Sequence, residues 1–149
     1  MIQRHDSLIV QVITRFLVPV FQIFAAYVFF HGHYSPGGGF QAGVMIGASL
    51  VLEMLVGTKK ELEKFSVLHE FQGAACGLGL YALVGGTALL YGGEFLNYGW
   101  LRFLGEDAAM RRYWAILIVE AGVTVVVAMT IVVIFQVLAF LPDRSEAKR

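Results

Sequence analysis

Residues 31–40 read HGHYSPGGGF and interrupt two long apolar runs with a polar, glycine-rich stretch. Three consecutive glycines after Pro36 free the backbone from the steric limits that a Cβ imposes, so the chain can reverse tightly or lie close against a neighbour. Two histidines, His31 and His33, flank the turn on its other side. We therefore interpret this stretch as the turn between two membrane-spanning helices.

The composition of the chain is that of an integral membrane protein. Of its 149 residues, 58% are hydrophobic and 15% are charged, and the mean hydropathy is +0.71. A soluble domain of this size would carry about 25% charged residues. The apolar runs have the length of about 20 residues that a helix needs to cross a bilayer core of about 30 Å. The first run is too long for a signal peptide and lacks a small-x-small cleavage site, so we expect it to be retained.

The apolar runs predict an all-α integral membrane protein with four transmembrane helices in a single domain, residues 1–149. The predicted spans cover about residues 8–30, 39–57, 68–91 and 113–141. Basic residues outside the spans indicate the orientation. Seven basic residues lie in the N-terminal tail, the second loop and the C-terminal tail: Arg4, Lys59, Lys60, Lys64, Arg144, Lys148 and Arg149. Three lie in the first and third loops: Arg102, Arg111 and Arg112. We expect both termini to be cytoplasmic.

Two of the predicted helices carry a face of small residues. In the second span, Gly39, Gly43 and Gly47 recur every four residues, a pattern that permits close helix approach. A polar row with the same spacing lies on roughly the opposite side: Gln41, Met45, Ser49 and Glu53. A third-span face holds His69, Gly73, Gly77, Tyr81 and Gly85. We expect the second helix to be sandwiched between partners and the third helix to pack tightly.

Ionisable residues inside a span must find a partner or water, so they are functional candidates by default. Arg15 and Glu53 lie at nearly equal distances from the turn, sixteen residues before His31 and fifteen residues after Gly38. In an antiparallel hairpin with a rise of about 1.5 Å per residue, both charges reach nearly the same height. We expect them to interact directly or through water.

The Arg15 and Glu53 pair has two interpretations. It is either a structural ion pair that fixes helix register, or a stepping stone for protons or cations, because a carboxylate whose counter-charge moves has a switchable proton affinity. His69 and Glu70, at the cytoplasmic entry of the third span, are candidates to join it. Glu120 lies about seven residues inside the last span. It has no obvious counter-charge in the chain, so we expect a functional or subunit-pairing role facing a neighbouring subunit.

The remaining polar features exclude several classes of function. Histidine titrates near pH 6.5, so His31 and His33 are either a proton relay or an ordinary interfacial turn. No further Cys, His or Asp follows at metal-ligand spacing, and no Lys-Ser or Lys-Thr follows the glycines, so we expect neither a metal nor a nucleotide site. The chain shows no nucleophile with a nearby base, so we expect neither an enzyme active site nor a cofactor. A net charge of +0 without a basic run gives no reason to expect nucleic acid.

The turn and the span that follows it, which ends in Glu53, resemble the MnhB-type (MrpB-type) subunit of the Mrp multisubunit sodium/proton antiporters and the equivalent small subunit of membrane-bound hydrogenases. The likeness covers nearly the whole chain: its length, its four spans and an outer loop at residues 92–97, GGEFLN. The signature residues are His31, His33, Pro36, Gly37, Gly38, Gly39 and Phe40. The resemblance implies a small membrane component of a large hetero-oligomer that exchanges cytoplasmic sodium for external protons. It also implies that large subunits similar to those of respiratory complex I translocate the protons.

We weigh three functions against these features. The leading one is a non-enzymatic subunit of a monovalent cation (sodium)/proton antiporter in the cytoplasmic membrane, lining or supporting the ion path beside other membrane subunits. The second is an ion-coupling subunit of an energy-converting hydrogenase or related redox complex. The third is a purely structural scaffold, for which neutralising Glu53 and Glu120 would leave transport intact. A stand-alone transporter is disfavoured because the chain shows no internal repeat.

Overall fold

The computed structural model describes residues 8–32, 36–57 and 66–140. It contains four long helices and two short 3-10 helices: α1 (Leu8–His31), α2 (Gly39–Val56), α4 (Val67–Leu90), η1 (Tyr98–Trp100), η2 (Arg102–Leu104) and α5 (Ala108–Phe140). The described ranges contain no strand. Each long helix is long and apolar enough to cross a membrane, which confirms the predicted fold class. His33, the charged second loop and the C-terminal tail lie outside the described residues.

The last helix begins at Ala108, five residues before the predicted start of the span at residue 113. The sequence assigned Arg111 and Arg112 to the connection before the span, whereas the helix includes both. The residue at which the membrane span itself begins stays a prediction. In the structure the Arg111 backbone N–H donates to the Asp107 carbonyl at 3.1 Å, a bond of the first helical turn. The Arg111 side chain turns back to the preceding connection and donates to the carbonyls of Gly105 at 2.8 Å and Gly99 at 3.0 Å. The charge therefore stabilises the start of α5 and does not delay it.

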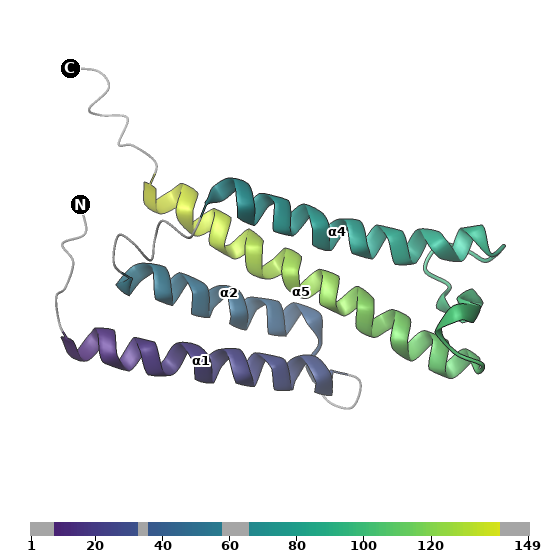
Figure 1. Ribbon diagram of the computed structural model, residues 1–149, viewed down its shortest axis with the longest axis horizontal. Coiled ribbons are helices and arrows are strands. Elements are labelled where there is room, and N and C mark those ends of the chain that lie inside the picture. Colours follow the sequence, from purple (N-terminus) through teal and green to yellow (C-terminus); the bar gives the residue numbers. More distant parts are fainter. Residues whose placement is uncertain (1–7, 33–35, 58–65, 141–149) are drawn as a thin grey trace, which may run out of the picture.

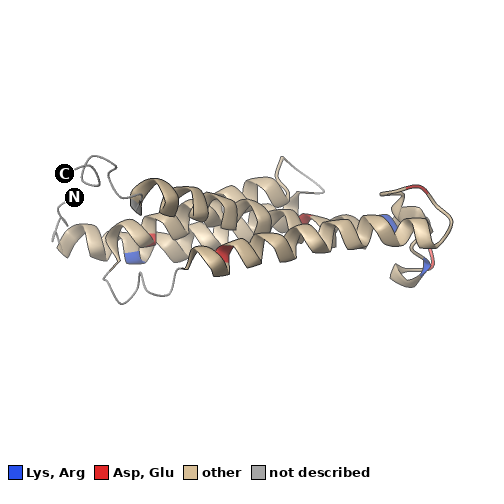
Figure 2. Ribbon diagram, turned by 90° about the horizontal axis from the view of Figure 1, so that it is seen from above, with Lys and Arg blue, Asp and Glu red and all other residues tan. Residues whose placement is uncertain are grey.

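The connection between α4 and α5 forms a folded cap on one end of these helices (Figure 2). Leu101 is fully buried in a cluster with residues from the end of α4 and the first half of α5: Val84, Ala88, Ala115 and Val119. With 33 residues, α5 is about 50 Å long, well beyond a hydrocarbon core of about 30 Å. The cap and the first turns of α5 therefore extend past the apolar layer.

The four helices lie in a single row, in the order α1, α2, α5, α4 (Figure 1). Each contacts its neighbour in the row, and α1 makes no extended contact with α4 or α5 among the described residues. The second helix lies between α1 and α5, which confirms that it is sandwiched. A row of this kind leaves both broad faces of α2 and α5 without a covering helix from the described part of the chain.

The glycine face of α2 packs against α5, and the two helices run parallel. The backbone of Gly39 lies against Glu120, a Cβ at Gly43 would lie 2.8 Å from the Thr124 carbonyl oxygen, and one at Gly47 would lie 3.0 Å from the Ile131 Cβ. Side chains of any size at these positions would push the helices apart. The close approach predicted from the spacing is therefore confirmed.

The glycine face of α4 packs against α5 in the antiparallel direction. A Cβ at Gly77 would lie 2.6 Å from the Gly122 carbonyl oxygen, and a Cβ at Gly122 would lie 2.7 Å from the Gly77 carbonyl oxygen. One turn away, Gly73 faces Met129. Gly85 packs instead against Phe95 and Leu96 of the cap, with Phe95 atoms 2.8 Å from the position of its Cβ. The predicted glycine face of α4 thus packs against α5 along part of its length and against the cap at its end.

Gly77→Ala should destabilise the α4–α5 contact. The added methyl group overlaps the Gly122 backbone, and overpacking of this kind costs about 1–3 kcal/mol. The measurement is the midpoint temperature of the purified protein in detergent. Gly79→Ala is the matched control, because nothing lies within 4 Å of its Cβ position and alanine favours the helix. Equal midpoints for the two variants would contradict the proposed packing.

Raising the pH above 10 should weaken the cap. Burial raises the pKa of the Tyr98 hydroxyl above its ordinary value of 10.0, and the neighbouring Tyr81 hydroxyl adds to the shift. The folded cap therefore favours neutral Tyr98, and its stabilising contribution is present below pH 10 and lost as the pH rises through the raised value. Thermal unfolding between pH 9 and 11 should show a smaller loss for Tyr98→Phe than for the unchanged protein. A parallel loss in both would exclude Tyr98 as the cause.

Candidate functional site

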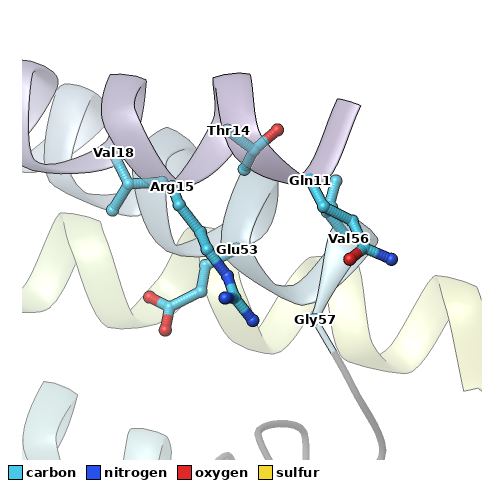
Figure 3. A pocket seen from close by; sticks show the side chains of 7 residues that line it. All are labelled: Gln11, Thr14, Arg15, Val18, Glu53, Val56 and Gly57. Carbon is cyan, nitrogen blue, oxygen red and sulfur yellow. The ribbon is translucent and has the colours of Figure 1, made fainter. Parts of the chain in front are cut away.

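Arg15 of α1 and Glu53 of α2 line the same hollow, which has a volume of about 150 Å³. The residues that line it are Gln11, Thr14, Arg15, Val18, Glu53, Val56 and Gly57. Figure 3 shows the Arg15 side chain extending across the side chain of Glu53. The structure thus brings together the two charges that the residue count from the turn placed at one height. It does so with an exposed arginine and a half-buried glutamate.

The polar row of α2 (Gln41, Met45, Ser49 and Glu53) also contacts α1 at Ser49, one turn from Glu53. Ser49 is 1% exposed, and its hydroxyl donates to the Ile46 carbonyl at 2.7 Å. The amide of Gln22 on α1 donates to the Ser49 hydroxyl at 3.5 Å. Gln41, at the start of the row, is exposed. Much of the polar face that we expected to need partners therefore meets α1 within the chain.

Glu120 of α5 lies against the glycine turn at the start of α2. Its Oε1 atom is 3.0 Å from the position of a Cβ at Gly38, which has a φ of 108° and is the N-cap of α2. Glycine is needed here both for this backbone conformation and for the space. The Thr124 hydroxyl, one turn along α5, lies 3.0 Å from the Gly39 carbonyl oxygen and 2.8 Å from that of Glu120, and donates to them.

The position of Glu120 answers the question that the sequence left open about its counter-charge. A carboxylate beside the first turn of a helix is stabilised by the helix dipole and its free N–H groups. The Oε2 atom of Glu120 is buried and has no hydrogen-bond partner among the described residues. The depth of Glu120, about seven residues in the last span, predicts a position on the outer side, nearer the histidine turn than the level of Arg15. The sequence did not identify Gly38 and Gly39 as its neighbours.

Four further signature residues are described at this turn, namely His31, Pro36, Gly37 and Phe40. The His31 Nδ1 donates to the Tyr27 carbonyl at 3.0 Å, and its ring stacks on that of Tyr27. Gly37 lies against the Val28 carbonyl oxygen, which would be 2.8 Å from its Cβ. Pro36 and Phe40 are exposed. The turn therefore closes on α1 and α5 with backbone contacts and presents its larger side chains outward.

His69 and Glu70 do not line the hollow of Arg15 and Glu53. His69 is exposed at the start of α4. Glu70 is 6% exposed, and its Oε1 atom accepts a hydrogen bond from the Ser66 backbone N–H at 3.2 Å. The carboxylate thus caps its own helix. Within the described ranges, no group of three or more His, Cys, Asp or Glu side chains is arranged to hold a metal ion.

Comparison with known proteins places these features in a family context. Residues 9–133 match the family model described as "Domain related to MnhB subunit of Na+/H+ antiporter". The chain is 29% identical over 136 residues to the B-type subunit of the Na(+)/H(+) antiporter of Bacillus subtilis, a match that covers 87% of this chain and 95% of the relative. It is 27% identical to the protein of the same name from Alkalihalophilus pseudofirmus, over 86% of this chain and 94% of the relative.

A third relative carries the similarity inside a much longer polypeptide. The chain is 31% identical over 86 residues to a probable K(+)/H(+) antiporter component of Rhizobium meliloti, whose name combines the A-type and B-type subunits. The match covers 58% of this chain and 9% of that protein. A segment similar to this chain is therefore found there in one polypeptide with other sequence.

Arg15→Gln and Glu53→Gln should be energetically coupled. Side chains in contact typically show a coupling energy of about 0.5–3 kcal/mol, so the double variant should be more stable than the sum of the single effects predicts. The measurement is a double-mutant cycle on midpoint temperatures in detergent. Arg15→Gln with Glu120→Gln is the matched control, since Glu120 lies at the glycine turn. Additive behaviour of both pairs would show that Arg15 and Glu53 share a hollow without interacting.

Proposed function

The chain belongs to the MnhB family, and from this membership we propose that it is a non-enzymatic membrane subunit of a multisubunit sodium/proton antiporter. Two relatives matched over most of their length are named as B-type subunits of such antiporters. The relatives named above are all antiporter subunits, so we do not favour a hydrogenase-type complex. The host complex then supplies further membrane subunits as partners of this chain.

The open row of helices is the observation that carries this proposal. An ion that crosses a membrane needs polar groups enclosed away from lipid. The described helices carry ionisable groups at the Arg15 and Glu53 hollow and at the Glu120 turn, but their row has no covering helix that would enclose these groups on its broad faces. We infer that neighbouring subunits complete a route along which Arg15, Glu53, His69, Glu70 and Glu120 are the candidate polar groups.

The proposed location is the cytoplasmic membrane, with both termini on the cytoplasmic side. The start of α1 and the end of α5 lie at one end of the row (Figure 1). The excess of basic residues, seven against three, belongs to the tails and loop at this same end. The glycine turn and the cap would then face outward, and the Arg15 and Glu53 hollow would lie nearer the cytoplasm.

A structural scaffold is the second candidate. The close contacts at Gly43 and Gly77 hold α2 and α4 on α5, and they would serve assembly equally well without any ion. The two candidates differ in what the buried charges do. Only the ion-route proposal requires them to change their interactions during exchange.

Glu53→Gln and Arg15→Gln should each slow sodium/proton exchange by at least about tenfold, which corresponds to about 1.4 kcal/mol, while the complex still assembles. Glu120→Gln tests the glycine turn with the same expected result. The measurement is sodium-driven proton movement in vesicles that contain the complete complex, with assembly followed on native gels. Glu94→Gln, an exposed carboxylate in the cap, is the matched control and should keep the full rate.

Two outcomes would reject the ion-route proposal. If exchange and assembly fall together in the charge variants, the charges are structural. If exchange keeps its full rate in all three variants of an assembled complex, the described charges are not on the route.

A further inference from the structure

One polar side chain of α4 and one of α5 are buried. Glu70 of α4 is 6% exposed and Gln136 of α5 is 5% exposed. The Oε2 atom of Glu70 and the Oε1 atom of Gln136 are both buried, and neither has a hydrogen-bond partner among the described residues. Leaving such an oxygen without a partner costs about 1–3 kcal/mol, and more for a charged group.

The register of the two helices brings these side chains to neighbouring turns. Gly77 packs against Gly122 and Val126, and Gly73 packs against Met129. Continuing this antiparallel register by one turn places Glu70 at the level of residues 132 and 133, with Gln136 one further turn, or about 5 Å, along the axis.

Glu70 and Gln136 also lie on the faces of α4 and α5 that contact each other, and their side chains tilt toward each other. Glu70 lies seven residues before Gly77, and Gln136 lies seven residues after Met129, so each continues the contact face of its helix. Side chains of a helix tilt toward its N-terminus. Because α4 and α5 are antiparallel, this tilt brings the end of Glu70 toward Gln136 and the end of Gln136 toward Glu70.

Both unpartnered oxygens, Glu70 Oε2 and Gln136 Oε1, are suited to bind a cation. An ionised carboxylate is only an acceptor, and so is an amide oxygen. The Oε1 atom of Glu70 already accepts from the Ser66 N–H, so Oε2 is the buried oxygen that has no hydrogen-bond partner among the described residues. On the elements packed here, the charged and titratable groups besides Glu70 are exposed His69 and Cys76 and half-buried Tyr81 on α4, Arg111, Arg112, Tyr113 and Glu120 in the first half of α5, and Glu53 on α2. The second half of α5, from residue 121 to residue 140, contains no lysine or arginine.

We propose that Glu70 and Gln136 bind one sodium ion between α4 and α5, with water completing its oxygen shell. Glu70 lies in the first turn of α4, so the site opens at the end of the row that we assign to the cytoplasm. This inference rests on the proposed antiporter function and adds a residue, Gln136, and a bound ion to it. Oxygen atoms are also the ligands of sodium in other transporters, where unwound backbone carbonyls and the C-terminal ends of half-helices coordinate it.

The test is sodium protection of Glu70 in the complete, purified complex. A hydrophobic carbodiimide reacts with a protonated buried carboxyl group, and a bound sodium ion should prevent the reaction. Mass spectrometry follows the labelled peptide at fixed pH and ionic strength, with sodium replaced stepwise by choline. We expect sodium to abolish labelling of Glu70 and to leave that of exposed Glu94 unchanged.

Gln136→Leu should raise the sodium concentration for half protection by about tenfold, because the ion loses one of its two side-chain ligands. Gln72→Leu, on the exposed side of α4, is the matched control and should leave it unchanged. Labelling that responds to pH but not to sodium would overturn the site, and would favour a direct hydrogen bond from the Gln136 amide to Glu70.

A second measurement decides the case in which carbodiimide fails to reach Glu70. In vesicles, Gln136→Leu should raise the KM for sodium of the exchange and leave its dependence on protons unchanged. An unchanged KM would overturn the inference. Exchange by the unaltered complex reports on the proposed function alone, so its failure can be told apart from a failure of the sodium site.

Discussion

The close approach of α5 to its two neighbours is the constraint on which the rest of the structure depends. Helices in lipid gain no hydrophobic free energy by associating, so they are held by close packing and hydrogen bonds. Here Gly43 of α2 and Gly77 of α4 bring backbone against backbone on two sides of α5. The central helix therefore fixes both neighbours, and α1 is held in turn by α2. The positions of all the buried charges follow from these contacts.

The contacts divide the polar groups between the two ends of the row. At one end the parallel pairing of α2 with α5 brings Glu120 to the glycine turn, where the start of α2 supplies a favourable field for its carboxylate. At the other end lie the hollow of Arg15 and Glu53 and the buried oxygens of Glu70 and Gln136. Between the two sets the helices carry no lysine, arginine, aspartate or glutamate (Figure 2). Ions that use both would need the neighbouring subunits in between.

The sequence predicted those features that depend on one helix or on two helices joined by a short turn. Hydropathy identified the four spans, and counting from a common turn placed Arg15 level with Glu53. It did not predict which helix packs against the glycine face of α2. Gly39 and Glu120 are 81 residues apart, and the glycine spacing predicts close packing without identifying the helix that packs there. It also missed Gln136, because a glutamine near a helix end is typical of an interface with water. It did not show that α5 begins five residues before the predicted span, because the side chain of Arg111 binds carbonyls of the preceding connection that the sequence does not reveal.

The attachment of α1 through α2 alone has a mechanical consequence. Every other long helix in the described part of the chain is tied to α5 directly, whereas α1 lies on the flank of the row. A sliding or rolling motion of α1 would therefore change the separation of Arg15 from Glu53 and leave the α2, α5 and α4 assembly undisturbed. Arg15 is thus carried by the helix on the flank of the row, and Glu53 by a helix that is held on both sides.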